Sequence, residues 1–180
     1  MDLTTLTAQI EDLGAAPPFE KWHPPFCGDI DMTIKADGSW WYMGSPIGRE
    51  KLVKLFAGVL IKEGDEFFLK TPAEKVRIKV EDAPFVITGW QRHDTDDGPA
   101  IEVISNLGHV AVLSETHPLV VDHSNPEQPR PYVTLHRGLQ ALVHRNVYYQ
   151  WVDIAEPAII DGLEHLVITS GKSRFSLGQL

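Results

Sequence analysis

The sequence MTIKADGSWWYMGSPIGREKLVKLFAGVL, residues 32–60, predicts a β-hairpin followed by an amphipathic helix. Its Asp37-Gly38 dipeptide tolerates the positive φ angles of a tight hairpin turn. Ser45 and Pro46 then suit the N-cap and the first position of a helix, because a serine oxygen accepts from a free N–H and proline lacks one. Apolar residues follow at helical spacing, and these are Leu52, Leu55, Phe56, Val59 and Leu60. We therefore expect a helix that starts after Ser45 and buries this stripe.

A second hairpin is predicted after Gly64, which is expected to end the helix. The apolar residues 67–69 precede a turn at 71–74. Apolar and basic residues then alternate over 76–80, which is the period of a half-buried strand. The first unit thus reads as hairpin, helix, hairpin.

The same order of elements recurs in the second half of the chain. It consists of a hairpin over 132–143 that turns at Arg137-Gly138, a helix over 147–155 capped by Asn146 and stopped by Pro157, and a hairpin that turns at Ser170-Gly171. We therefore predict an internal duplication, in which residues 38–80 and 138–177 share one order of elements.

The predicted fold class is α+β, rich in β-structure and built from two duplicated hairpin-helix-hairpin units. Further strands are expected at 85–90, 101–104, 110–113 and 119–121. We place a domain boundary at Ala83-Pro84. Residues 1–83 then hold the first unit and a short N-terminal helix, capped by Thr4 or Thr5, and residues 84–180 form the second domain.

Composition limits the partners and the compartment. The 180 residues carry 16 basic and 25 acidic side chains, a net charge of −9, which argues against nucleic acid because a phosphate backbone needs clustered cations. One cysteine cannot form an intramolecular disulfide. We find neither a membrane-spanning apolar run nor a secretory leader, so we expect a cytoplasmic protein that does not bind membranes.

Three stretches resemble a known family. They are WHPPFCGDID at 22–31, GSPI at 44–47 and EDAPF at 81–85. Together they resemble a bacterial family named domain of unknown function 1285, over nearly the whole chain. The resemblance implies a duplicated core, a C-terminal half superficially like pleckstrin-homology folds, and a ligand site between the halves. It also implies a nucleotide-like ligand and a role in signal transduction, and it provides no catalytic residues that could be carried over to this chain.

The predicted ligand site lies at the junction of the two halves and comprises Trp22, Asp29, Trp41, Ser45 and Arg49. A capped helix start favours an anion, and Arg49 could grip it with its guanidinium. Trp40 and Trp41 should face opposite sides of a strand, which leaves one ring for the core and the other for a ligand or a domain interface. Alternatives stay open: Asp29 as a turn residue, Arg49 as a solvated side chain, and the tryptophans as packing residues.

Catalysis and metal binding have weaker support. Cys27 has only His23 nearby as a base. His117, Asp122 and His123 form the closest group of metal-ligand types, but their spacing matches no standard site. We therefore expect no cofactor and no metal. The leading hypothesis is a non-enzymatic ligand-binding or sensory protein. The alternatives are a small enzyme that uses Cys27 or carboxylate and histidine chemistry, and a protein-interaction module.

Overall fold

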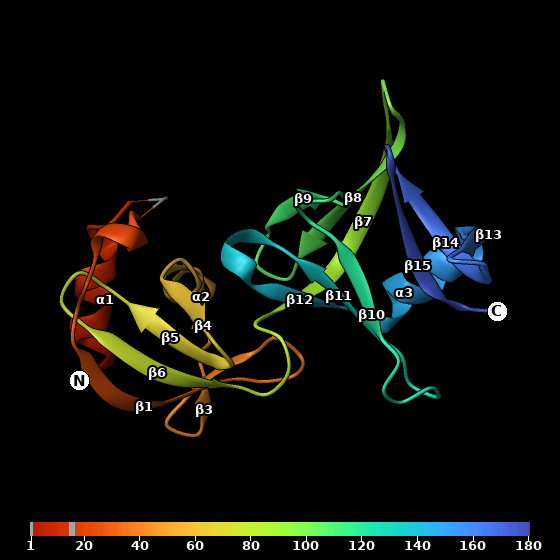
Figure 1. Ribbon diagram of the computed structural model, residues 1–180. Helices are drawn as coiled ribbons and strands as arrows, with labels where there is room; N and C mark the ends of the chain where they lie inside the picture. The colour runs from red at the N-terminus through yellow and green to blue at the C-terminus, as the bar shows by residue number, and fades with distance from the viewer. Residues whose placement is uncertain (1, 15–16) are drawn as a thin grey trace. The chain divides into compact units, whose positions relative to one another are not determined.

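The computed structural model describes residues 2–14 and 17–180, and the chain divides into two compact units, Met1–Asp82 and Ala83–Leu180. Within the described residues it forms three α-helices, two six-stranded sheets and one three-stranded sheet (Figure 1). The fold is α+β and rich in β-structure, as predicted. None of the helices in these two ranges is long and apolar enough to cross a membrane.

Unit 1 is a six-stranded sheet with two α-helices. Its elements are α1 (Leu3–Glu11), a 3₁₀ turn η1 (Phe19–Lys21), β1 (Phe26–Ile34), β2 (Trp40–Tyr42), β3 (Ser45–Pro46), α2 (Glu50–Ala57), β4 (Leu60–Glu63), β5 (Glu66–Lys70) and β6 (Lys75–Val80). The sheet order is β3-β2-β1-β6-β5-β4. The central strands β1 and β6 run parallel, while all other neighbours are antiparallel.

The core of unit 1 joins one face of this sheet to the two helices. The buried apolar side chains include Leu6, Ile10, Met32, Ile34, Trp40, Val53, Phe56, Val59, Leu60, Leu69, Val76 and Ile78. Phe56 stacks on Trp40 with ring centroids 6.3 Å apart. Trp41 is only half-buried, so the two adjacent tryptophans do face opposite sides of β2.

The prediction for the start and end of the α2 region was wrong. Met43 and Gly44 both adopt positive φ angles and form a two-residue turn, so Ser45 and Pro46 pair with β2 instead of starting a helix. Arg49 is the N-cap of α2, and its side chain makes no capping hydrogen bond. The helix also ends earlier than expected, because Leu60 already belongs to β4.

The caps of the other two helices also differ from the prediction. Asp2 caps α1, since its carboxylate accepts from the Thr5 N–H at 2.8 Å. A ring nitrogen of His144 accepts from the Asn146 N–H and caps α3, so both helices begin earlier than predicted.

Unit 2 contains the longer list of strands. The strands are β7 (Phe85–Thr95), β8 (Gly98–Ser105), β9 (Val110–Val112), β10 (Leu119–Asp122), β11 (Arg130–Thr134), β12 (Gln140–Val143), β13 (Glu156–Ile160), β14 (Leu163–Ser170) and β15 (Ser173–Gln179). A 3₁₀ turn, η2 (His136–Gly138), precedes β12, and an α-helix, α3 (Arg145–Ile154), follows it. The sheet order is β10-β11-β12-β7-β8-β9, and β13, β14 and β15 form a separate sheet. Trp151 on α3 is fully buried and meets the Trp90 ring edge-on.

The two six-stranded sheets share one topology. Each consists of two antiparallel meanders of three strands. The two meanders form one sheet because the first strand of the unit pairs in parallel with the sixth. Written from the other end, the second sheet reads β9-β8-β7-β12-β11-β10, which repeats the order β3-β2-β1-β6-β5-β4. A duplication of fold therefore relates β1–β6 to β7–β12.

The residues that make up the two repeats differ from the predicted ones. Residues 38–80 and 138–177 do share an order of elements, since in both a helix follows at least one strand and precedes a three-stranded meander. The strand pairing differs, however. In unit 1 the meander after α2 joins the sheet through β6, whereas in unit 2 β12 already occupies the equivalent place beside β7. The meander after α3 therefore forms its own sheet.

Two substitutions on α2 test its packing. Phe56→Ala should lower the free energy of unfolding by about 3–5 kcal/mol, because this ring is fully buried against Trp40. Leu55 is only half-buried, contrary to the prediction, so Leu55→Ala should cost about 1–2 kcal/mol. Urea denaturation of both variants provides the measurement. Equal losses would contradict the assigned helix face.

Candidate functional site

A pocket of about 770 Å³ lies in unit 2 between β10 and β15. β10 is the end strand of the six-stranded sheet and β15 the end strand of the small sheet, and the two lie side by side without pairing. Edge strands keep backbone donors and acceptors that no neighbouring strand uses. The pocket walls therefore combine side chains with two unpaired sheet edges.

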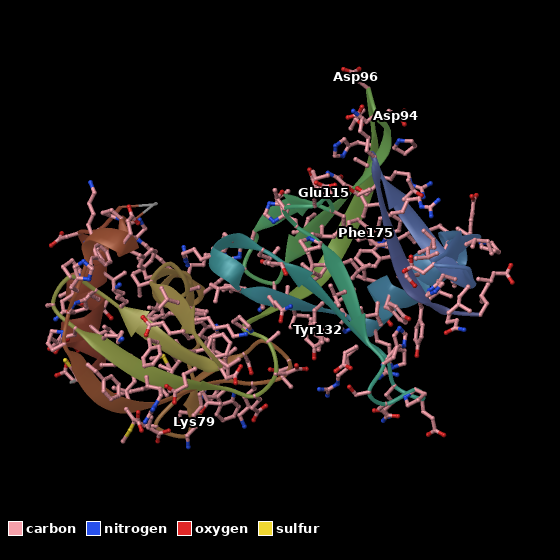
Figure 2. The ribbon with its side chains drawn as sticks, viewed as in Figure 1. Lys79, Asp94, Asp96, Glu115, Tyr132 and Phe175 are labelled. Carbon is pink, nitrogen blue, oxygen red and sulfur yellow. The ribbon has the colours of Figure 1, made fainter. Side chains whose placement is uncertain are left out.

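Apolar side chains form much of the lining. They include Leu119, Val121, Pro126, Pro129 and Phe175. Phe175 is half-buried, and Figure 2 labels it in unit 2 near β10 and β15. Its ring offers a flat apolar surface, as ligand pockets commonly do.

A small polar network lies in the same pocket. The Ser176 hydroxyl lies 2.8 Å from Nδ1 of His165 and accepts from the Gly178 N–H at 3.1 Å. His123, which directly follows β10, approaches the same strand. A Cβ on Gly178 would lie 3.2 Å from Cε1 of His123, so glycine at this position leaves room for the imidazole. These groups place hydrogen-bonding atoms at the pocket wall.

Arg174 adds a positive charge to the lining. Its guanidinium makes no hydrogen bond or ion pair with any residue in the described part of the chain. Lys172, two residues earlier, differs because its ammonium lies 3.2 Å from the Asp97 carboxylate. Arg174 is therefore the cation of this hairpin that remains able to bind an anion.

Asp29, one of the predicted site residues, is paired with Arg77 in the structure. Arg77 binds its carboxylate with two nitrogens, at 2.6 and 3.1 Å, and also donates to Glu66 at 2.9 Å. The hydrogen bond from Arg77 lowers the pKa of the Asp29 carboxyl below its usual value. Asp29 thus belongs to an exposed ion-pair network across β1, β6 and β5.

The other four predicted residues also lie in unit 1. Trp41 and Ser45 share the β2–β3 hairpin, and Arg49 stands at the start of α2. The Trp41 ring is covered by the Lys35 ammonium, 4.3 Å from its centroid, and its N–H donates to Ser39. Trp22 packs its ring edge-on against Phe19 at 5.4 Å. Ser45 provides no helix cap, so that part of the argument for an anion at α2 is lost.

The residues considered for catalysis and metal binding are dispersed. The Cys27 thiol is exposed and donates to the Pro25 carbonyl at 3.3 Å. His117 donates to the Thr134 carbonyl, while Asp122 accepts from Ser124. Among residues 2–14 and 17–180, no group of three or more histidine, cysteine, aspartate or glutamate side chains could hold a metal ion.

Comparisons with known proteins place the chain in a family. A model described as "Domain of unknown function (DUF1285), N-terminal domain" matches residues 17–83, and one described as "Protein of unknown function (DUF1285), C-terminal domain" matches residues 84–177. The chain belongs to the DUF1285 family. No curated protein matches it.

Two solved structures of DUF1285 family proteins are similar to this chain. One, from Silicibacter pomeroyi DSS-3, has 37% sequence identity and a TM-score of 0.83, and the match covers 97% of this chain and 95% of that one. The other, from Shewanella baltica OS155, has 33% identity and a TM-score of 0.54, and covers 68% of this chain and 90% of that one. Their descriptions assign no activity.

The pocket residues of this DUF1285 chain were not predicted from its sequence. From the sequence, His123 was considered only as a metal-ligand type, and the residues after the Ser170-Gly171 turn only as part of a hairpin. The sequence did contain one sign of a half-buried strand here, since the polar Arg174 and Ser176 alternate with the apolar Phe175 and Leu177. Alternation alone could not show that β15 faces β10 rather than solvent.

A separate imidazole cluster lies in unit 2 of the DUF1285 chain. The His136 ring lies 4.7 Å from the His109 ring and 5.8 Å from the Phe85 ring, measured between centroids. Burial is the main cause that lowers the pKa of His136 from 6.5 to about 4, followed by repulsion from Arg137 and His109. His136 is therefore neutral at pH 7.

This pKa predicts a pH dependence of stability. The unfolded chain binds a proton at His136 near pH 6.5, whereas the folded chain binds it near pH 4. The folded state should therefore lose about 2–3 kcal/mol as the pH falls from 6.5 to 4, and His136→Gln should remove this loss. Urea denaturation at pH 7 and pH 4.5 measures it. The exposed His93→Gln serves as the control, and an unchanged pH slope in His136→Gln would contradict the assignment.

Proposed function

We propose that this DUF1285 protein is a cytoplasmic bacterial signalling protein that binds a small, anionic, nucleotide-like ligand between β10 and β15, without chemical turnover. The observation that carries this proposal is the Arg174 guanidinium. It has no partner among the described residues, and it lines a pocket of about 770 Å³. Pockets of roughly 300–1,000 Å³ with apolar walls and a few polar groups are typical of small-molecule sites.

The polar groups of the pocket suit a phosphate. Arg174 can donate two parallel hydrogen bonds to phosphate oxygens, and such charge-assisted bonds are stronger than neutral ones. His123 and His165 can add ring N–H donors, and Ser176 a hydroxyl. The chain as a whole carries a charge of −9, so this local concentration of donors contrasts with the acidic composition of the chain.

The remaining walls suit a nucleobase. Phe175 provides an aromatic ring on which a flat base can stack. The facing edges of β10 and β15 provide backbone N–H and C=O groups, which match the donors and acceptors on the edge of a base. The strand-rich sheet of unit 2, followed by α3, also supports the proposed superficial likeness to pleckstrin-homology folds.

A second location for the anion is proposed around Arg49, with Trp22, Asp29, Trp41 and Ser45 in the same unit. Arg49 is exposed and makes no side-chain capping bond, so its charge is accessible. Enzymatic turnover at Cys27 has less support, since the contact found for its thiol is a backbone carbonyl.

Matched charge removals on one hairpin test the proposal. Arg174→Gln should weaken binding of adenosine or guanosine monophosphate by about 1.5–3 kcal/mol, because one charged hydrogen-bonding group is lost. Lys172→Gln removes the same charge but should leave the affinity nearly unchanged, since Lys172 is paired with Asp97. Isothermal titration calorimetry measures both, and adenosine without phosphate should bind more weakly than either nucleotide.

The same titrations would also show that the anion binds at another location or that the ligand is not a nucleotide. Loss of affinity in Arg49→Ala, with Arg174→Gln unaffected, would assign the anion to the start of α2. A thermal-shift panel of nucleotides at millimolar concentration that leaves the melting temperature unchanged would contradict nucleotide binding at both places.

A further inference from the structure

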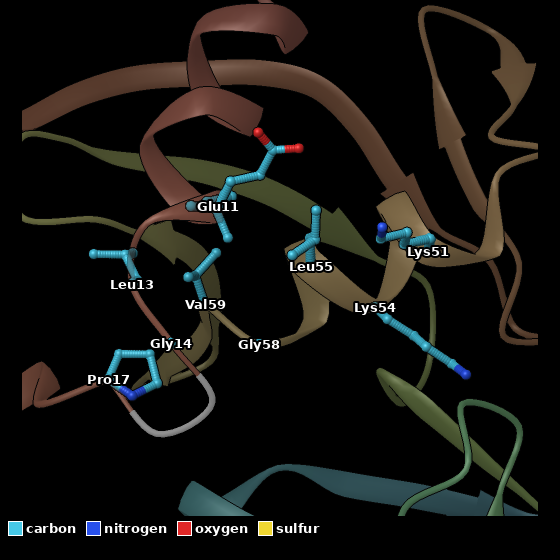
Figure 3. Close-up of a pocket in the computed structure, with 10 residues that line it drawn as sticks. Glu11, Leu13, Gly14, Pro17, Lys51, Lys54, Leu55, Gly58 and Val59 are labelled. Carbon is cyan, nitrogen blue, oxygen red and sulfur yellow. The ribbon is translucent and has the colours of Figure 1, made fainter.

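Unit 1 contains its own pocket, of about 350 Å³, lined by residues of α1 and α2 and by Leu13, Gly14, Pro17, Gly58 and Val59 (Figure 3). Five of its lining side chains are apolar. They are Ile10, Leu13, Pro17, Leu55 and Val59. Ile10 and Val59 are buried and form the inner wall, whereas the other three are half-buried. Apolar surface from separate chain segments thus converges on one small space, which suits an aliphatic group.

The charged residues of this lining differ in what they can contact. Lys54 is engaged, because its ammonium lies 3.1 Å from the Glu50 carboxylate. Figure 3 shows the ends of the Lys54 and Glu11 side chains directed away from Leu13 and Val59. Neither charged group therefore points into the apolar interior of the pocket.

Lys51 has a different position. It precedes Leu55 by four residues on α2, so the two side chains share one side of the helix. Figure 3 shows Lys51 beside Leu55. Its ammonium forms no ion pair or hydrogen bond with any residue that the structure describes. The pocket thus combines an apolar interior with one uncompensated cation at its border.

We infer that this pocket binds an aliphatic monocarboxylate. Its hydrocarbon chain lies among Ile10, Leu55 and Val59, and its carboxylate pairs with Lys51. An alkylamine would place like charge beside Lys51, and an alcohol would leave the ammonium without a counter-charge. This inference does not depend on the nucleotide proposal, because it concerns other residues in the other unit.

Calorimetric titration of the full chain with sodium decanoate tests this site. Lys51→Gln should weaken decanoate binding about tenfold or more, the effect of losing one charged hydrogen bond, whereas Lys54→Gln on the same helix should change it less than twofold. Leu55→Trp should abolish binding by filling the pocket. Circular dichroism verifies that this variant keeps its fold, and decylamine serves as the charge-reversed probe.

Several outcomes would overturn the inference. They are failure of decanoate to bind below millimolar concentration, equal losses in the two lysine variants, and binding of decylamine as tight as that of decanoate. If Leu55→Trp does not fold, the two lysine variants still decide the question. Nucleotide titrations of the same variants should remain at the wild-type value, so failure at one pocket is distinguishable from failure at the other.

Discussion

The parallel pairing of the first and last strand is the constraint on which each six-stranded sheet depends. Parallel neighbours cannot be joined by a tight turn, so the chain has to leave the first strand and return through a long connection. In this protein the connection contains four further strands, which extend the sheet on both sides of the central pair, and in unit 1 it also contains α2. The meanders, their antiparallel turns and the outer edges all follow from that one pairing.

The same constraint explains why unit 2 has a pocket between two sheets. β12 completes the six-stranded sheet beside β7, so no place remains there for the strands that follow α3. Those strands form a small sheet whose outer strand, β15, lies next to the outer strand β10. A hydrogen bond from the Ile101 N–H to the buried Ser170 hydroxyl also ties the small sheet to β8. Two unpaired edges thus face each other where a single continuous sheet would leave no space.

The local sequence pattern predicted most of the individual strands and turns correctly, but it did not predict which strands pair with one another. Asp37-Gly38 and the alternation over 76–80 were interpreted correctly, because turn chemistry and period-two burial are properties of neighbouring residues. The Met43-Gly44 turn was missed because a methionine at positive φ has no sequence signature. Whether a meander joins β7 or forms its own sheet depends on residues far away in sequence. The candidate pocket was missed for the same reason, since Arg174 lies on β15 and His123 directly after β10, and no local pattern encodes the adjacency of these two strands.

The central parallel pair also determines how unit 1 resists a pulling force. The chain enters the sheet of unit 1 at the start of β1 and leaves it at the end of β6, which are opposite ends of one hydrogen-bonded pair. Pulling these points apart slides the two strands past each other, so their hydrogen bonds are loaded in shear together. A hairpin pulled from its open end would instead peel one bond at a time. Unit 1 is therefore braced at its middle against stretching along the strands, a property that single-molecule force spectroscopy can measure.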